Sequence, residues 1–169
     1  MRRLLLCVLL SLPAVAHASD PVARDYLPNP ALTPGAVRSV VVAELCHPRF
    51  TTKTVRKTTS AMKRRVYAAY GLADGANTGW CWNPAATREW EQGCGIDHLV
   101  GLQLGGADTI DNLWPVPHFG PWNKHMKDRV ENEAKRRVCR LHEPLEEIQA
   151  QIAADWRVLY VRWFGLPSY

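Results

Sequence analysis

The sequence predicts a single α+β domain, because one strand-like stretch precedes two long helices that each have a continuous apolar face. Apolar residues recur at every fourth position over residues 122–138, and a second set falls on one face over residues 145–163. Residues 96–104 are mostly apolar and end at Gly105 and Gly106, which is typical of a strand closed by a turn. The apolar positions of the two helices are Trp122, Met126, Val130, Ala134 and Val138, then Leu145, Ile148, Ile152, Trp156, Leu159 and Trp163.

The ends of these elements also have sequence signals. Pro121 suits the first turn of the first long helix. The second helix begins after Pro144 and is stopped by Gly165. Between the strand and the helices, residues 108–117 are expected to form a loop and a further short strand. Residues 71–95 are rich in Gly, Asn and Trp, and we expect a loop there that a disulfide holds.

A shorter helix is expected before the strand. Ser60 can cap it, Met62, Val66 and Tyr70 recur at helical spacing, and Gly71 can end it.

The residues ahead of that helix are expected to have no core of their own. Residues 19–36 contain four prolines and a glycine, so we expect an extended lead-in over residues 19–44. The folded domain is then expected to cover residues 45–165.

The first eighteen residues have the order of a secretory signal peptide. Arg2 and Arg3 precede an apolar stretch at residues 4–12, and residues 16–18 form an A-x-A cleavage pattern. A membrane anchor is the alternative, but the apolar stretch is much shorter than the roughly 20 residues of a spanning helix. We therefore expect a secreted or periplasmic protein that has no membrane span after cleavage.

The basic residues are unevenly distributed along a chain whose formal net charge is +5. Residues 49–65 contain seven basic residues and no acidic one. Such a run is either a solvated face or a surface that binds phosphate, and the sequence leaves both interpretations open. The seven residues are Arg49, Lys53, Arg56, Lys57, Lys63, Arg64 and Arg65.

Four cysteines remain after the signal peptide, and an even number in an exported chain predicts two disulfides. Three pairings of these four are possible. A zinc site is disfavoured because the chain has no C-x-x-C pair. The four residues are Cys46, Cys81, Cys94 and Cys139.

One stretch carries a recognisable constellation of chemical groups. Asp97 and His98 lie in the predicted strand, Asn112 follows His98 by fourteen residues, and a helix follows. This arrangement resembles the HNH nucleases of the ββα-metal superfamily. In them, two strands and a helix hold a D-H pair, an Asn about fourteen positions after the His, and an Asn or His on the helix. The resemblance implies a ββα-metal core at about residues 94–140.

The similarity extends to small exported bacterial HNH-like proteins and covers roughly residues 45–163. It rests on segments 52–56 (T-K-T-V-R), 112–115 (N-L-W-P), 127–132 (K-D-R-V-E-N) and 154–156 (A-D-W). In these proteins a disulfide recurs at the places of Cys46 and Cys139, which implies that pairing. That pairing leaves Cys81 and Cys94 as the second disulfide, which would close a short loop.

The resemblance also implies a mechanism for phosphodiester hydrolysis. His98 would act as general base toward water, Asp97 and a helix residue would hold a divalent cation, most simply Mg²⁺, and Asn112 would brace the loop. Because neighbours on a strand point to opposite faces, Asp97 and His98 can share a site only if the chain bends there. Lys53, Arg56 and Lys127 are the candidates for phosphate contact.

This sequence departs from the family pattern at the helix ligand. The usual position is occupied by Pro121, which cannot ligate a metal. Asn123 and His125 are the available substitutes, and Asn123 is favoured because it lies nearer the start of the helix. His47, His118 and His142 have no comparable context, and we expect ordinary surface residues there.

The expected function is that of an exported, monomeric, metal-dependent endonuclease acting on DNA or RNA. The alternative is a non-catalytic, exported nucleic-acid-binding module on the same fold. A structural envelope protein held together by disulfides is a third interpretation, but it leaves the basic residues at 49–65 unexplained.

Overall fold

The computed structural model describes residues 27–72, 94–118 and 122–167. They form one small α+β domain, as the sequence predicts. The predicted signal peptide, most of the 71–95 loop and Pro121 lie outside these residues. The elements are α1 (Val42–Leu45), η1 (Thr52–Thr54), α2 (Ser60–Ala69), β1 (Cys94–His98), η2 (Leu102–Leu104), η3 (Ile110–Asn112), β2 (Leu113–Pro117), α3 (Lys124–Leu141) and α4 (Leu145–Phe164).

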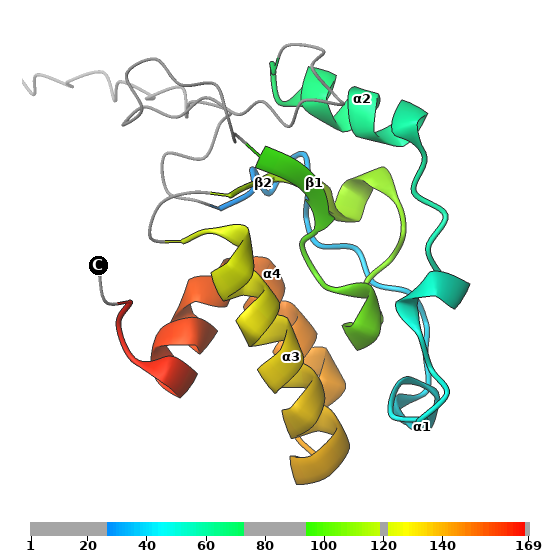
Figure 1. Ribbon diagram of the computed structural model, residues 1–169, viewed down its shortest axis with the longest axis vertical. Coiled ribbons are helices and arrows are strands. Elements are labelled where there is room, and N and C mark those ends of the chain that lie inside the picture. The colour runs from blue at the N-terminus through cyan, green and yellow to red at the C-terminus, as the bar shows by residue number, and fades with distance from the viewer. Residues whose placement is uncertain (1–26, 73–93, 119–121, 168–169) are drawn as a thin grey trace, which may run out of the picture.

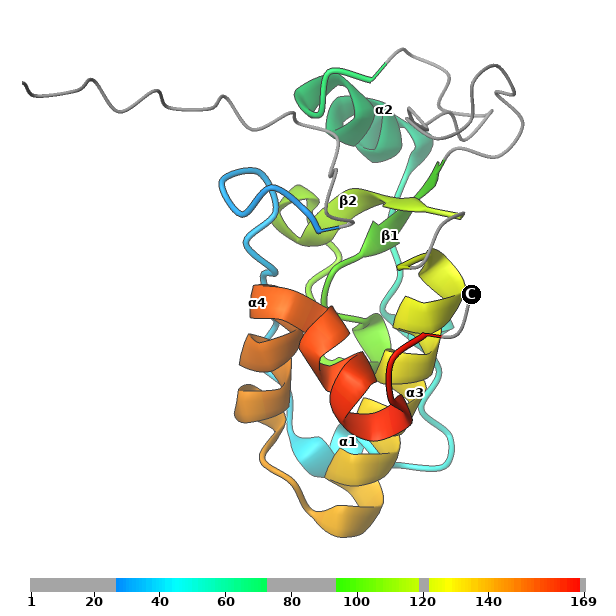
Figure 2. The same ribbon diagram turned by 90° about the vertical axis from the view of Figure 1, so that its left-hand side faces the viewer.

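A two-stranded antiparallel sheet lies in the middle of the molecule, with α2 at one end and α3 and α4 at the other (Figures 1 and 2). In the register, Ile96 is opposite Pro115 and His98 is opposite Leu113. The core continues from the sheet into α3 and α4, where Val130, Ile152 and Trp156 are fully buried. The sheet and the two long helices therefore share one core.

The predicted strand over residues 96–104 is wrong beyond His98. The chain turns back there through η2, and the amide of Gly106 donates to the carbonyl of Gly101 at 3.1 Å. A Cβ at Gly106 would lie 1.8 Å from the carbonyl oxygen of Val100, so no larger residue fits this turn. Gly105 has a φ of +80°, a conformation that glycine adopts without strain. Tertiary contacts thus end the strand earlier than its apolar residues suggest.

Both long helices are present, with two differences from the sequence prediction. The helix α3 begins at Lys124, because the side chain of Asn123 accepts a hydrogen bond from the amide of Met126 and caps the helix. The helix α4 has extended backbone angles at Asp155, whose carboxylate accepts from the amide of Arg157 at 2.9 Å. The apolar faces of both helices pack on the core as expected.

The shorter elements hold the outer parts of the chain to this core. The N-cap of α2 is Thr59 and not the predicted Ser60. Tyr70, at the other end of α2, is buried and its hydroxyl lies 2.8 Å from that of Thr33. Thr33, within the predicted lead-in, therefore packs against the domain.

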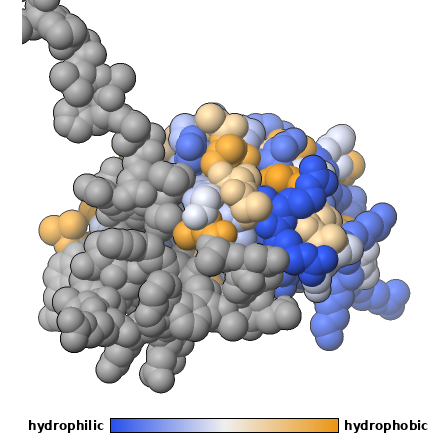
Figure 3. All heavy atoms as spheres, turned by 90° about the horizontal axis from the view of Figure 1, so that it is seen from above, coloured by the Kyte–Doolittle hydropathy of each residue, from blue (hydrophilic) through white to orange (hydrophobic). Residues whose placement is uncertain are grey.

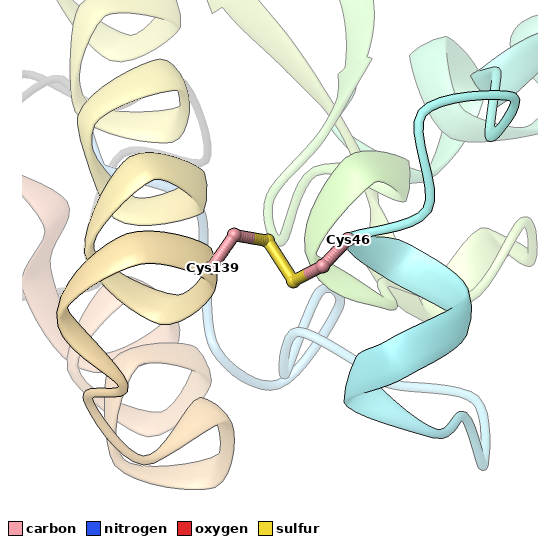
Figure 4. Close-up of a disulfide and its surroundings, with 2 residues drawn as sticks. All are labelled: Cys46 and Cys139. Atoms are coloured by element: carbon pink, nitrogen blue, oxygen red, sulfur yellow. A yellow bond between two sulfur atoms is a disulfide. The ribbon is translucent and has the colours of Figure 1, made fainter.

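One disulfide joins Cys46, just after α1, to Cys139 in α3 (Figure 4), which confirms that predicted pair. It links residues 93 positions apart, for which the chain-entropy model gives roughly 4–5 kcal/mol of stabilisation. Cys94 is also disulfide-bonded, but the predicted partner Cys81 lies outside the described residues. Within those residues, no helix is long and apolar enough to cross a membrane.

Candidate functional site

His98 ends β1 as a buried histidine that faces a carboxylate. Only 3% of its side chain is exposed, and its Nε2 lies 2.7 Å from Oδ1 of Asp108. Burial lowers the pKa of the imidazole, and Asp108 opposes that effect without cancelling it. The imidazole of His98 is therefore mainly neutral at pH 7.

Asp108 is a residue that the sequence reasoning missed. Its carboxylate accepts hydrogen bonds from the amide of Lys57 and from the hydroxyl of Thr58, as well as facing His98. Burial alone would raise the pKa of this carboxyl, but the hydrogen bonds outweigh burial and lower it. Asp108 is thus an ionised group that joins the 57–58 segment to His98.

Asp97 contacts α3 and not the loop that His98 faces. Its Oδ2 lies 3.5 Å from Nζ of Lys127 and 3.7 Å from Nζ of Lys124. Burial would raise the pKa of this carboxyl, but the two ammonium groups outweigh burial and lower it. Asp97 is mostly buried, with 17% of its side chain exposed.

Lys127 does not occupy the surface position expected of a phosphate contact. Its side chain is completely buried, and Nζ donates to the carbonyl of His98 at 2.6 Å as well as to Asp97 and Glu131. The Glu131 carboxylate packs so closely on Gly101 that a Cβ there would come within 2.5 Å of it. Lys127 therefore holds the end of β1 against α3, and its ammonium group does not face a substrate in solution.

Asn112 is fully buried and braces the loop between His98 and Asp108. Its Oδ1 accepts from the amide of Val100, and its Nδ2 donates to the carbonyls of Val100 and Ala107. Its own carbonyl accepts from the amide of Leu99 at 2.7 Å. Val100 and Ala107, at the two ends of the loop, are thereby both bonded to the side chain of Asn112.

The two candidate helix ligands lie at the start of α3. Asn123 uses its side-chain oxygen to cap the helix, and His125 is exposed. The described segments contain no group of three or more His, Cys, Asp or Glu residues that could hold a metal ion. Mg²⁺ usually keeps several waters and is often bound through only one or two carboxylates. Asp97 is a carboxylate close to the start of α3, where its Oδ2 lies 3.7 Å from Nζ of Lys124.

The seven basic residues at positions 49–65 are all exposed, and together they are called the basic surface below. Its 56–58 segment is the part near His98, because Lys57 and Thr58 bind Asp108. None of the seven forms an ion pair with another described residue, whereas α3 and α4 pair several arginines with acids. Arg56 is close enough to lower the pKa of His98 by charge repulsion. Seen from the end where α2 lies (Figure 3), the face carries a group of strongly hydrophilic residues. The exposed residues are Arg49, Lys53, Arg56, Lys57, Lys63, Arg64 and Arg65.

Comparison with known proteins does not assign the chain to a family. A scan against protein-family models, a search of curated proteins and a search of solved structures each found no match. The function is therefore inferred from the residues of the site and their contacts.

Proposed function

We propose that the protein is an exported, metal-dependent endonuclease of the HNH (ββα-metal) kind, which hydrolyses phosphodiester bonds of DNA or RNA. One observation carries the proposal. The buried His98 lies near Arg56 and is joined through Asp108 to Lys57 and Thr58, within an exposed basic run that forms no ion pair among the described residues. A base of this kind is suited to activate water, and the surface is suited to bind the phosphates of the substrate.

The order of the elements supports the same proposal. Asp97 and His98 end β1, Asn112 directly precedes β2, and Asn123 caps α3. The antiparallel pairing of β1 with β2 brings the first three into one region, and Lys127 ties that region to α3. This is the sequence of parts that the resemblance to HNH nucleases implies.

In the proposed reaction, His98 removes a proton from the water that attacks phosphorus. Its burial favours the neutral imidazole, which is the form that accepts a proton at pH 7. Asn112 keeps the loop after His98 in place through three side-chain hydrogen bonds. The base is therefore positioned before substrate arrives, which is the condition for efficient general-base catalysis.

Asp97 would hold the divalent cation together with Asn123 or His125. When bound, the cation supplies positive charge that stabilises the leaving oxygen. Lys124 also faces Asp97, but its Nζ lies 2.7 Å from Asp128 and keeps that partner if Asp97 turns to a metal. The buried Lys127 remains bound to Glu131 in the same way.

Lys53 and Arg56 are the proposed phosphate contacts. Both are exposed and neither has an acidic partner among the described residues. Phosphate contacts of this kind fix the register of a nucleic acid and carry no sequence information. These two contacts would therefore hold the nucleic acid in place without reading its sequence.

A second candidate is a nucleic-acid-binding module without catalysis. The observation in its favour is that two lysines already neutralise Asp97. Plasmid DNA and single-stranded RNA incubated with the purified protein and Mg²⁺, with and without EDTA, separate the two. Cleavage that EDTA abolishes supports the nuclease, and binding without cleavage under both conditions supports the module.

Export is proposed on the sequence of residues 1–18. N-terminal sequencing of the protein from the producing cell's periplasm or medium tests it. A mature chain that begins at Ser19 is expected, and a cytoplasmic protein that retains Met1 contradicts the proposal.

A further inference from the structure

The contact between His98 and Asp108 determines which nitrogen of the imidazole can act. We propose that Asp108 is a positioning residue that holds His98 as the Nε2–H tautomer, so that Nδ1 is the atom that accepts the proton. This inference rests on the proposed nuclease function and adds to it a residue outside the D-H…N pattern. Asp108 touches the base and not the reacting atoms.

The tautomer follows from the three partners of the carboxylate. An ionised carboxylate only accepts hydrogen bonds. The amide of Lys57 and the hydroxyl of Thr58 already donate to Asp108, and the third partner is Nε2 of His98 at 2.7 Å. Nε2 must therefore carry its hydrogen, and in a neutral imidazole the lone pair is then on Nδ1.

Asp108 is itself held from two directions. Its backbone follows Ala107, whose carbonyl accepts from Nδ2 of the buried Asn112 at 2.8 Å. Its side chain is 9% exposed and is bound by the 57–58 segment. The carboxylate therefore has little freedom to move away from His98. A group that fixes the tautomer of an imidazole must be held in this way.

The same contacts join the base to the basic surface. Lys57 and Thr58 directly follow Arg56, a proposed phosphate contact, and both bind Asp108. One carboxylate thus sets the position of His98 relative to the segment that would hold the substrate backbone. If His98 were displaced from this segment, turnover should fall more than the affinity for the substrate falls. The basic side chains would remain exposed and could still bind phosphate.

Asp108→Asn separates a positioning role from simple hydrogen bonding. If the amide oxygen faces His98 and Thr58, the NH₂ group is directed at the amide of Lys57, and two donors meet. If the amide is turned over, its NH₂ donates to Nε2 and moves the imidazole hydrogen to Nδ1. In either orientation, the amide cannot accept all three hydrogen bonds that the carboxylate accepts from Lys57, Thr58 and His98. The matched control is Asp111→Asn, because Asp111 is an exposed acid in the same loop. Its backbone carbonyl accepts the hydrogen bonds from Gly35 and Ala36, and the substitution leaves that carbonyl in place.

The experiment combines ¹⁵N NMR of the histidine rings at neutral pH with steady-state cleavage of DNA in Mg²⁺. The wild-type protein is expected to show His98 with hydrogen on Nε2. In Asp108→Asn, kcat should fall on the order of 10²- to 10⁴-fold with KM little changed, and the His98 ring signals should shift. Asp111→Asn should match the wild type in both measurements. The wild-type spectrum needs no variant, so the tautomer is decided even if Asp108→Asn folds poorly.

The outcomes distinguish the inference from the function on which it rests. A wild-type His98 with hydrogen on Nδ1 overturns the inference, and so does full activity in Asp108→Asn when His98→Ala is inactive. In both cases the nuclease function stands. A wild-type protein that cuts neither DNA nor RNA overturns both the function and the positioning role of Asp108.

Discussion

The side chain of Asn112 and the backbone of Val100 form a reciprocal pair of hydrogen bonds, each 2.9 Å long and both buried. Through this pair and a third bond to Ala107, one amide fixes the turn that ends β1 and carries Asp108. Asn112 is thus part of the structure of the site, and the reacting groups lie around the loop that it holds.

Replacing Asn112 by Ala should destabilise the protein by roughly 2–4 kcal/mol, because it leaves the buried amide and carbonyl of Val100 and the partly buried carbonyl of Ala107 without this partner. Urea unfolding followed by fluorescence measures the change. Asn132→Ala, on the exposed face of α3, is the matched control and should stay within about 0.5 kcal/mol of wild type. Equal stability of Asn112→Ala and the control would contradict the bracing role.

Lys127→Met should destabilise the protein by about 3–5 kcal/mol, since it removes the cation that faces the buried Glu131 and one of the two lysines beside Asp97. Burial already raises the pKa of Glu131 to about 7, and loss of Lys127 should raise it further. Adding Glu131→Gln should recover part of that stability, which urea unfolding of the single and double variants can show. The slope of DNA affinity against salt should not change in either variant. A stable Lys127→Met protein with a flatter salt dependence would restore Lys127 as a phosphate contact.

Lys53→Ala and Arg56→Ala should each weaken DNA binding and reduce the slope of log K against log salt by about 0.9 for each phosphate that the variant no longer neutralises. Binding is measured in EDTA, so that cleavage does not interfere. Arg162→Ala removes an exposed arginine on α4 and is the control for a change in net charge. Identical slopes in all three variants would place the nucleic acid elsewhere.

The pH dependence of kcat/KM should reflect the buried state of His98. Because burial lowers its pKa below the ordinary value of 6.5, more than half of the imidazole is neutral at pH 6.5, and the acid limb of the activity should be centred at lower pH. The free energy of unfolding should change in the same direction. A group whose pKa is lowered by folding stabilises the folded state above its unfolded pKa, and this stability is lost as pH falls through the folded value. An acid limb centred above 6.5 would contradict the burial of the base.

The helices could be predicted from the sequence because their signals are local. The apolar spacing over residues 122–138 and 145–163 needs no knowledge of the rest of the chain, and both helices are present. The end of β1 could not be predicted, since it depends on the Asn112 side chain, twelve positions from Val100. The break at Asp155 depends on its bond to Arg157, in a segment whose apolar spacing continues without interruption.

The site was less predictable than the helices, because its contacts join distant segments. Asp108 binds Lys57 and Thr58 from 51 and 50 positions away, and no spacing rule connects them. The burial of Lys127 did have a signal. It precedes Val130, Ala134 and Val138 by three, seven and eleven positions, which places it on the buried face of α3. A charge on that face is expected to be paired internally.

The most direct test of the nuclease proposal is the rate of plasmid cleavage by His98→Ala compared with wild type, in Mg²⁺ and with both proteins shown to be folded. The rate should fall about 10²–10⁴-fold, because the variant lacks the group that accepts the proton from water. His142→Asn, at the far end of α3 and in a left-handed conformation that Asn tolerates, should cut like the wild type. If folded His98→Ala cuts DNA and RNA as fast as wild type, His98 is not the base and the proposed site is wrong.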